Sequence, residues 1–279
     1  MKQKLGFAFL SLIITALVSC NDQASKPATE QPAEAKQPGL KELDLDYAGD
    51  NIAMKGYVAY DTSLDTKRPA ILIIPEWWGL NDYAKMRARE LAKLGYIAMA
   101  MDMYGNGVNT DSPAVAGKLA GQFYTKPLSA KARIDAALVA LKSFQQTDTG
   151  KLAAIGYCFG GAMVLNAARL GEPFKGVVSF HGNLVGTPAN KDLLKAKVLI
   201  CHGEADPFVK PEEITAFKKQ MDSIKADYTF KSYPNALHAF TNPQATELGK
   251  KWSLPIAYNG AADTASWNDM KAFFDTIFK

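Results

Sequence analysis

The strongest constraint on the fold is an alternation of short apolar runs with amphipathic segments from about residue 40 onward. The apolar runs occupy residues 71–75, 96–102, 152–157, 177–182, 198–203 and 228–234. The amphipathic segments occupy residues 81–95, 131–144, 161–171 and 211–224. Apolar runs of this length predict strands buried on both faces. Their alternation with helices predicts an α/β fold, in which a mostly parallel central sheet carries helices on both faces.

The segment that precedes these strands has a different pattern. Residues 41–61, KELDLDYAGDNIAMKGYVAYD, alternate apolar and polar side chains on either side of Gly49-Asp50. This pattern predicts two strands joined by a tight turn, which would form an antiparallel edge of the sheet. No internal repeat is visible, so residues 41–279 are expected to form one domain.

Candidate functional residues follow the apolar runs, because ligands of open parallel sheets bind beyond the carboxyl ends of the strands. The residues in these positions are Glu76, Trp77, Trp78, Tyr104, Cys158, His181, Asp206 and His238. We expect His181 to end its strand on the active side of the sheet and to line the pocket there.

Cys158 lies in the sequence Gly-Tyr-Cys-Phe-Gly at residues 156–160, between a predicted strand and a predicted helix. This is the cysteine form of a nucleophile elbow, a strained turn in which only small residues fit at Gly156 and Gly160. The helix that follows would favour a thiolate and offer an N–H group to an oxyanion. Taken alone, these five residues fit a small buried cysteine equally well.

Two residues further along the chain favour catalysis. Asp206 lies in a loop after one predicted strand, and His238 lies in a loop after the next. The order nucleophile, acid, histidine is that of α/β-hydrolases, in which the acid orients the histidine and the histidine transfers the proton. The alternatives are an ordinary Asp-Pro turn residue and a core histidine.

With these motifs the chain resembles the dienelactone hydrolases, carboxymethylenebutenolidase-like members of the α/β-hydrolase fold. The resemblance covers residues 45–279 and rests on the segments IPEWWGLNDY, MDMYG, GYCFGG, HGEAD and LHAF, which occur in family order. It implies that Cys158 is the nucleophile and that Asp206 and His238 complete a triad. It also implies that Glu76 contacts the thiol, where a carboxylate disfavours the thiolate and protects it from oxidation. The alternative for Glu76 is a salt-bridge or helix-dipole residue.

The resemblance also implies an oxyanion hole and a substrate clamp. The N–H groups of Trp77 and Phe159 match the family's oxyanion-hole donors. The family holds the substrate carboxylate with two arginines, but the corresponding segments here, MDMYGNG and HAFTN, contain none. We therefore expect a pocket for an uncharged ester, lactone or acyl group, lined by Trp77, Trp78, Tyr104 and Phe240. Residues 107–129 would form either a mobile flap or a surface helix.

The N-terminus resembles a bacterial lipoprotein signal. Residues 1–19 combine a basic start with an apolar run and end in Leu-Val-Ser, and Cys20 would become the lipid-modified first residue. Residues 20–40 are rich in Ala, Pro, Gln, Glu and Lys and predict a disordered tether. The expected location is the bacterial cell envelope, with the lipid as the contact to the membrane. The alternatives are an ordinary signal peptide and an uncleaved anchor helix.

Other partners are not expected. The formal charge of +4 is dispersed rather than clustered, which argues against a nucleic-acid partner. His181, His202 and His238 lack the close spacing of metal ligands, so we predict no metal site, and we read His202 as a residue that orients the acid loop. Cys158 and Cys201 should remain free thiols. The proposed chemistry requires no cofactor, and we expect a monomer.

These observations favour an envelope hydrolase that cleaves a small ester or lactone through a covalent thioacyl intermediate. One alternative is a binding or scaffold lipoprotein that kept the fold without turnover. Another is a thiol oxidoreductase, although the Cys-x-x-Cys spacing typical of that class is lacking.

Overall fold

The computed structural model describes residues 39–279, which belong to one compact unit. The predicted signal, the lipid-modified Cys20 and nearly all of the tether lie outside the described residues. The strands are β1 (Leu40–Gly49), β2 (Ile52–Asp61), β3 (Arg68–Ile74), β4 (Ile97–Ala100), β5 (Thr147–Tyr157), β6 (Gly176–Phe180), β7 (Lys197–Gly203) and β8 (Tyr228–Tyr233). The helices are α1 (Asp82–Lys93), α2 (Pro113–Thr125), α3 (Pro127–Lys142), α4 (Phe159–Arg169), α5 (Pro211–Ser223), α6 (Ala245–Trp252) and α7 (Gly260–Ile277).

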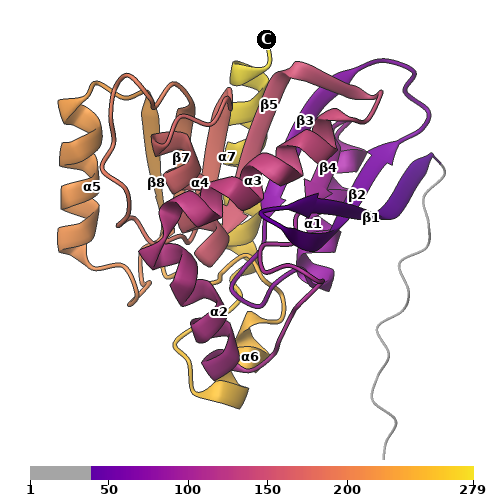
Figure 1. Ribbon diagram of the computed structural model, residues 1–279. Coiled ribbons are helices and arrows are strands. Elements are labelled where there is room, and N and C mark those ends of the chain that lie inside the picture. Colours follow the sequence, from indigo (N-terminus) through magenta and orange to yellow (C-terminus); the bar gives the residue numbers. More distant parts are fainter. Residues whose placement is uncertain (1–38) are drawn as a thin grey trace, which may run out of the picture. The chain divides into compact units, whose positions relative to one another are not determined.

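The strands form one eight-stranded sheet in the order β1-β2-β4-β3-β5-β6-β7-β8 (Figure 1). The pairs β1–β2 and β2–β4 are antiparallel, and all pairs from β4 to β8 are parallel. The predicted hairpin is confirmed, although its turn residues with positive φ are Asp50 and Asn51, one position later than expected. The mostly parallel sheet with an antiparallel edge is therefore an α/β-hydrolase fold.

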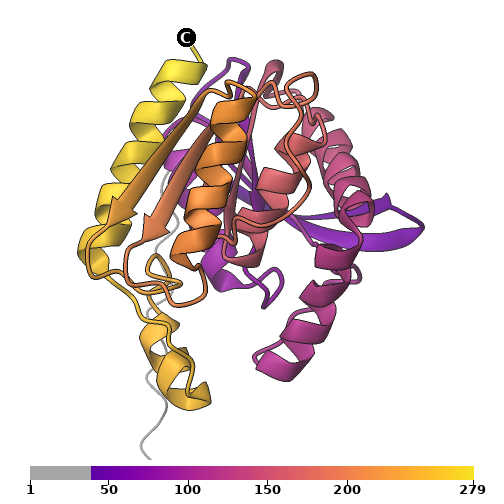
Figure 2. The ribbon, with the colours of Figure 1, turned by 90° about the vertical axis from the view of Figure 1, so that its left-hand side faces the viewer.

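Side-chain alternation along the central strands builds two apolar cores. In β3, Leu72 and Ile74 join the core beneath α3 and α4, whereas Ile71 and Ile73 join the core beneath α1 and α7. All four side chains are fully buried. Figure 2 shows α7 against one face of the sheet and α5 against the other. Both faces are thus covered, which is why the strands carry no polar face.

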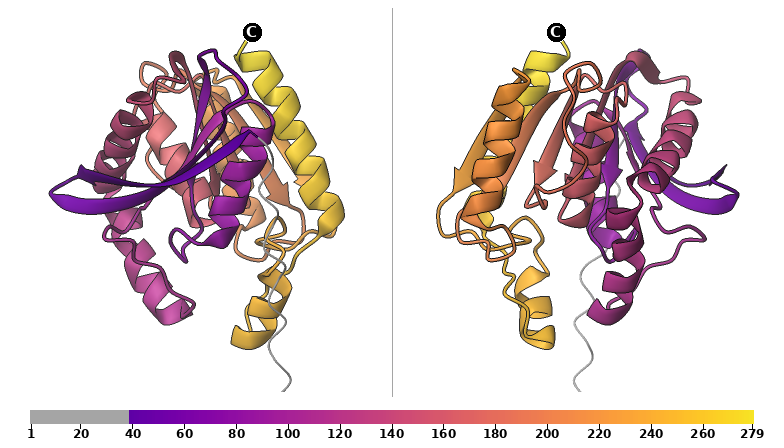
Figure 3. Two further views of the ribbon diagram at one scale, coloured as in Figure 1. Left: turned by 90° about the vertical axis from the view of Figure 1, so that its right-hand side faces the viewer. Right: turned by 60° about the vertical axis from the view of Figure 1, so that its left-hand side comes forward.

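The structure contains two helices that the sequence did not predict, and it decides between the two alternatives for a third segment. Residues 113–125 form α2, so the surface-helix alternative for residues 107–129 holds in the structure. Helices α6 and α7 were not predicted. Helices α2 and α6 project beyond the end of the sheet at which the parallel strands finish (Figure 3). Across residues 39–279, no helix has the length and apolar character needed to cross a membrane.

Candidate active site

Cys158 occupies the turn between β5 and α4. Its backbone has φ 53° and ψ −115°, a region that residues with a side chain rarely adopt. A Cβ atom on Gly156 would lie 2.0 Å from the carbonyl oxygen of Gly160, and one on Gly160 would lie 2.0 Å from the carbonyl oxygen of Ile74. Only glycine fits at either position, as the motif predicts. The turn leaves the thiol half-buried at the N-terminus of α4.

His238 and Asp206 form a buried pair beside this thiol. Nδ1 of His238 lies 2.8 Å from Oδ2 of Asp206, and Oδ1 of Asp206 accepts a hydrogen bond of 2.8 Å from the Phe208 N–H. Burial alone would lower the pKa of His238. The charge of Cys158 and side-chain hydrogen bonds with Asp206 and Cys158 outweigh it and raise the pKa to about 10. The structure therefore brings together the three residues that the sequence singled out.

A second buried histidine supports the turn from behind. The Cys158 N–H is shared between the Phe180 carbonyl oxygen at 3.0 Å and Nδ1 of His181 at 3.1 Å. Nε2 of His181 lies 2.7 Å from the Thr241 hydroxyl. Burial holds the pKa of His181 well below its usual value, so the ring is neutral. Because Nδ1 accepts, Nε2 carries the proton and donates to Thr241. The Thr241 hydroxyl in turn lies 2.6 Å from the hydroxyl of Tyr83.

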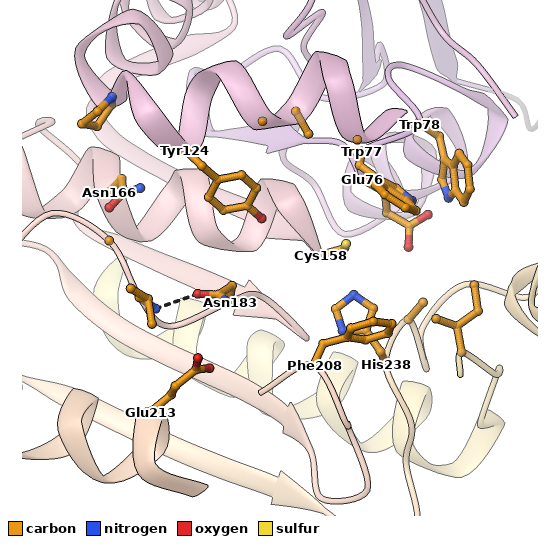
Figure 4. A pocket seen from close by; sticks show the side chains of 18 of the residues that line it. Glu76, Trp77, Trp78, Tyr124, Cys158, Asn166, Asn183, Phe208, Glu213 and His238 are labelled. Atoms are coloured by element: carbon orange, nitrogen blue, oxygen red, sulfur yellow. Dashed lines mark hydrogen bonds between the residues drawn. The ribbon is translucent and has the colours of Figure 1, made fainter. Parts of the chain in front are cut away.

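Glu76 lies at the same end of the sheet, just after β3, and is 3% exposed. Its Oε2 accepts a hydrogen bond of 2.7 Å from the Asn242 side-chain amide. Burial raises the pKa of Glu76 to about 7, although Asn242, His238 and Arg87 each act in the opposite direction. Glu76 and Cys158 line the same cavity, where Figure 4 shows both side chains near His238.

The cavity in front of Cys158 has a volume of about 1060 Å³. Trp77 and Trp78, whose ring centroids are 4.9 Å apart, line it beside Glu76. One wall comes from α2 and the other from the loop after β6 and the start of α5. The cavity is larger than a small ester requires.

The structure places three expected pocket residues elsewhere. Tyr104, His181 and Phe240 are not among the residues that line the cavity. The hydroxyl of Tyr104 donates a hydrogen bond of 2.7 Å to the Trp77 carbonyl oxygen, so Tyr104 helps to hold the loop that contains Trp77. Phe240 is fully buried, with its ring centroid 5.3 Å from that of His181. A position after a strand thus fixes the backbone but not the direction of the side chain.

The two expected oxyanion-hole donors follow Glu76 and Cys158 directly in the chain. Phe159 is the first residue of α4, where a backbone N–H has no partner within the helix. Trp77 follows Glu76 and lines the cavity. In residues 39–279 no group of three or more His, Cys, Asp or Glu side chains could hold a metal ion. His202 packs against Phe230, with ring centroids 5.6 Å apart.

Comparison with known proteins places this geometry in a family. The sequence model described as the dienelactone hydrolase family matches residues 54–278. The chain belongs to the dienelactone hydrolase family. Members of this family are hydrolases that act on small lactones and esters.

Individual relatives agree with this assignment. A crystal structure of a dienelactone-hydrolase-like promiscuous phosphotriesterase from metagenomic libraries has a TM-score of 0.80 and 34% identity, and the match covers 86% of this chain and 99% of that one. A protein of Aquifex aeolicus, named as a candidate carboxymethylenebutenolidase, is 26% identical over 84% of this chain and 98% of its own length. A Bradyrhizobium protein, named as a candidate 2-oxo-3-(5-oxofuran-2-ylidene)propanoate lactonase, is 27% identical over 72% of this chain and 81% of its own length.

Apart from one histidine, the charged residues of the cavity in this member of the dienelactone hydrolase family are acidic. No lysine or arginine is among the described residues that line it. Arg87 is buried against Asp263 and Glu90 on the opposite side of the sheet, and Arg169 donates to the Leu184 carbonyl oxygen. The arginine clamp that the family resemblance leads one to expect is therefore not replaced by another cation at the cavity wall.

Sequence reasoning missed several residues of the site. Asn242, which holds Glu76, lies four residues after His238, and this proximity was the only available signal. Tyr124 enters the cavity from α2, and Phe208 packs against His238 with ring centroids 5.0 Å apart. Asn183 and Glu213 line the part of the cavity that is remote from Cys158 in Figure 4.

Proposed function

We propose that this chain hydrolyses a small ester or lactone by covalent catalysis at Cys158. The observation that carries the proposal is the position of His238, whose Nδ1 lies 2.8 Å from Oδ2 of Asp206 and which lines the same cavity as Cys158. The strained backbone of Cys158, held by two glycines that admit no side chain, gives the thiol a defined direction.

The reaction has two halves. The Cys158 thiol passes its proton to His238 as the sulfur attacks the substrate carbonyl carbon, and the oxyanion accepts hydrogen bonds from the N–H groups of Trp77 and Phe159. His238 gives its proton to the leaving oxygen, so the C–O bond breaks and a thioester remains on Cys158. A water molecule then loses a proton to His238 and attacks the thioester carbonyl, which releases the acid and restores the cysteine.

The electrostatics of the site favour a proton on His238. With its pKa raised to about 10, His238 readily takes up the thiol proton and can then give it to the leaving oxygen. Glu76, whose pKa burial raises to about 7, is partly ionised at neutral pH. A carboxylate at this place stabilises the imidazolium and opposes the thiolate, so Glu76 would limit the reactivity of the thiol in the absence of substrate.

The substrate is proposed to lack a carboxylate, because no cation lines the described cavity to receive one. The two tryptophans favour an apolar or aromatic face next to the reacting carbonyl. This description fits simple esters and lactones better than dienelactone itself.

Mass spectrometry after exposure to an activated ester tests the nucleophile. The purified domain is mixed with p-nitrophenyl esters and lactones, and turnover is measured beside the mass of the intact protein. We expect hydrolysis, with an acyl adduct that maps to Cys158. Tight ligand binding without turnover would instead support a binding lipoprotein, and peroxide-dependent turnover of Cys158 would support a thiol oxidoreductase.

Neutral phosphotriesters form a second candidate substrate class. The metagenomic relative described as a promiscuous phosphotriesterase is 34% identical to this chain. A phosphotriester also carries no charge for an arginine to bind. Hydrolysis of diethyl p-nitrophenyl phosphate that disappears in Cys158→Ala protein is the expected result if this class is accepted.

We further propose that the protein is a lipid-anchored monomer of the bacterial envelope. The support is the sequence of residues 1–20 and the polar composition of the segment that follows it. Metabolic labelling with a radioactive fatty acid should modify the full-length protein, and Cys20→Ala should abolish the label. Light scattering of the soluble domain should give the mass of a single chain.

A further inference from the structure

The cavity extends well beyond the space around Cys158. Figure 4 shows Trp78 on one side of Cys158 and His238, and Asn166 and Glu213 on the other, with Asn183 between them and the thiol. A stripe of small and apolar side chains on α2 connects the two ends and consists of Gly117, Ala120, Gly121 and Tyr124. These residues follow the spacing of one helix face. The connecting wall therefore suits a chain of methylene groups rather than a polar linker.

Polar groups gather at the remote end. Asn166 is 3% exposed, and its Oδ1 accepts a hydrogen bond of 2.9 Å from the Thr187 N–H, which fixes the loop after β6. The Thr187 hydroxyl oxygen is buried and has no partner among the described residues. The side-chain oxygen of Asn183 accepts from the Val185 N–H at 2.8 Å. A buried hydroxyl without a partner is costly unless a ligand or water satisfies it.

Glu213 supplies the charge at this end. Its Oε2 is the acceptor of a long hydrogen bond, 3.4 Å, from the Lys210 N–H at the start of α5, so one part of its role is to cap the helix. Figure 4 shows its carboxylate directed toward Asn183 and the interior of the cavity. Glu76 and Glu213 are the carboxylates on the cavity wall, and neither lysine nor arginine accompanies them among the described lining residues.

We propose that the remote end of the cavity is a subsite for a positively charged group of the substrate, an ammonium, with Glu213 as its main acceptor. The acceptor oxygens of Thr187 and Asn183 complete the hydrogen bonds of the ammonium. The substrate is accordingly an ester whose apolar chain runs along α2 and ends in an amine. The inference rests on the proposed function, because the ester carbonyl must lie at Cys158.

Matched substrates test the subsite directly. Three series of p-nitrophenyl alkanoates of increasing length carry an amino, a methyl or a carboxyl group at the far end of the acyl chain. In the wild-type protein we expect the amino esters of one chain length to exceed the methyl esters in kcat/KM by about fivefold or more, and the carboxyl esters to be the poorest. The preference should peak at the length that spans the two ends.

Variants assign the preference to Glu213. Glu213→Gln keeps a side chain that can cap the helix. It should reduce the ratio of amino to methyl esters to about one, whereas Glu213→Lys should make carboxyl esters the better substrates. Glu212→Gln is the matched control, since it removes the same charge from an exposed neighbour that does not line the cavity. The control should leave the ratio as in the wild-type protein.

A binding measurement separates failure of the subsite from failure of the reaction. Alkylammonium ions and alkanoates of equal length are titrated into Cys158→Ala protein, and the fluorescence of Trp77 and Trp78 reports occupancy. Tighter binding of the ammonium ions that Glu213→Gln abolishes supports the subsite even where no ester is hydrolysed. Ester hydrolysis with a ratio of amino to methyl esters that Glu213→Gln leaves unchanged would overturn it, as would equal binding of the two ions.

Discussion

Cys158 follows one strand of the sheet and Cys201 lies within another, and their backbone conformation, burial and charged neighbours differ. Cys158 follows the last residue of β5, has a positive φ and is half-buried at the start of α4. Cys201 lies within β7 and is fully buried, with the Tyr233 hydroxyl 3.5 Å from its sulfur. Both thiols are free, as the sequence predicted.

The difference shows how the fold determines the chemistry of a thiol. Burial raises the pKa of Cys201 to about 12, with the charge of Asp269 acting in the same direction, so this thiol is protonated and inert at neutral pH. At Cys158 the chain leaves the sheet and turns into a helix, which exposes the sulfur to an imidazole and to free N–H groups. If β5 continued through residue 158, Cys158 would be a buried and unreactive strand cysteine like Cys201.

Alanine substitution of each cysteine should give the largest contrast. We expect Cys158→Ala to lower kcat/KM for an activated ester by at least about 10³-fold, because the nucleophile is lost. Cys201→Ala should keep activity within about twofold and destabilise the fold by about 1 kcal/mol, since it removes only one buried atom. Steady-state hydrolysis and urea unfolding measure these effects. Substantial turnover in Cys158→Ala would break the comparison at its central point.

Alkylation should separate the two thiols without any substrate. At pH 7.5 iodoacetamide should modify Cys158 at least about 100-fold faster than Cys201 in the folded protein. Peptide mass spectrometry at timed intervals gives both rates. In urea the rates should converge, because the unfolded chain gives both thiols ordinary surroundings. Equal rates in the native protein would show that the turn at Cys158 does not activate its sulfur.

The sequence predicts the features that depend on residues close together in the chain and misses those that depend on residues far apart in it. The strands were predictable because a continuous apolar run is stable only where it is buried. The turn at Cys158 was predictable because the two glycines that it requires lie within the same five-residue motif. Helix α7 has buried residues four apart, Ala262, Ser266, Met270 and Phe274. Two of these are small, so the pattern is weak in hydrophobicity.

The remote part of the cavity could not be predicted from the sequence. Asn183 and Glu213 belong to different strand–helix units, and only the tertiary fold brings the loop after β6 and the start of α5 to the same cavity. For Tyr104 and Phe240 the sequence predicted a place in the pocket, and this prediction is wrong. Both follow strands in the sequence, but their side chains pack beneath the site, because the backbone direction after a strand does not fix the rotamer.

The buried Glu76 beside Cys158 should make the unfolding free energy depend on pH, and this effect is smaller than the preceding ones. Its pKa in the folded protein is about 7, above the ordinary 4.5, so its stabilising contribution is complete below about pH 4.5 and is lost as the pH rises through 7. Glu76→Gln stays neutral and can still accept from Asn242. Between pH 4.5 and 8 the wild-type protein should therefore lose up to about 3 kcal/mol of unfolding free energy relative to the variant.

Urea titrations of both proteins at several pH values measure this difference. Glu172, whose pKa is also raised to about 7, is present in both proteins, so its contribution cancels. Cys201→Ala, taken through the same titrations, should run parallel to the wild-type protein across this range. A difference between wild type and Glu76→Gln that stays constant with pH would show that Glu76 is ionised at little cost in the folded protein.

Thr241 allows an indirect test of the turn at Cys158. Its hydroxyl bonds to His181, and His181 accepts a hydrogen bond from the Cys158 N–H. Thr241→Val removes the acceptor of the His181 Nε2–H and the partner of the Tyr83 hydroxyl while keeping the volume of the side chain. The buried donor is left unpaired, which should cost about 1–3 kcal/mol of stability. The turn at Cys158 and the loop of His238 then lose their common support, and we expect kcat to fall about tenfold with little change in KM.

Thr241→Ser keeps the hydroxyl and should restore kcat, which a defect in packing alone would not allow. The rate of Cys158 alkylation should fall in parallel with kcat in Thr241→Val, while that of Cys201 stays unchanged. If kcat is instead unaffected, the glycines and the hydrogen bond from the Cys158 N–H to the Phe180 carbonyl oxygen suffice to hold Cys158, and His181 is only a satisfied core histidine.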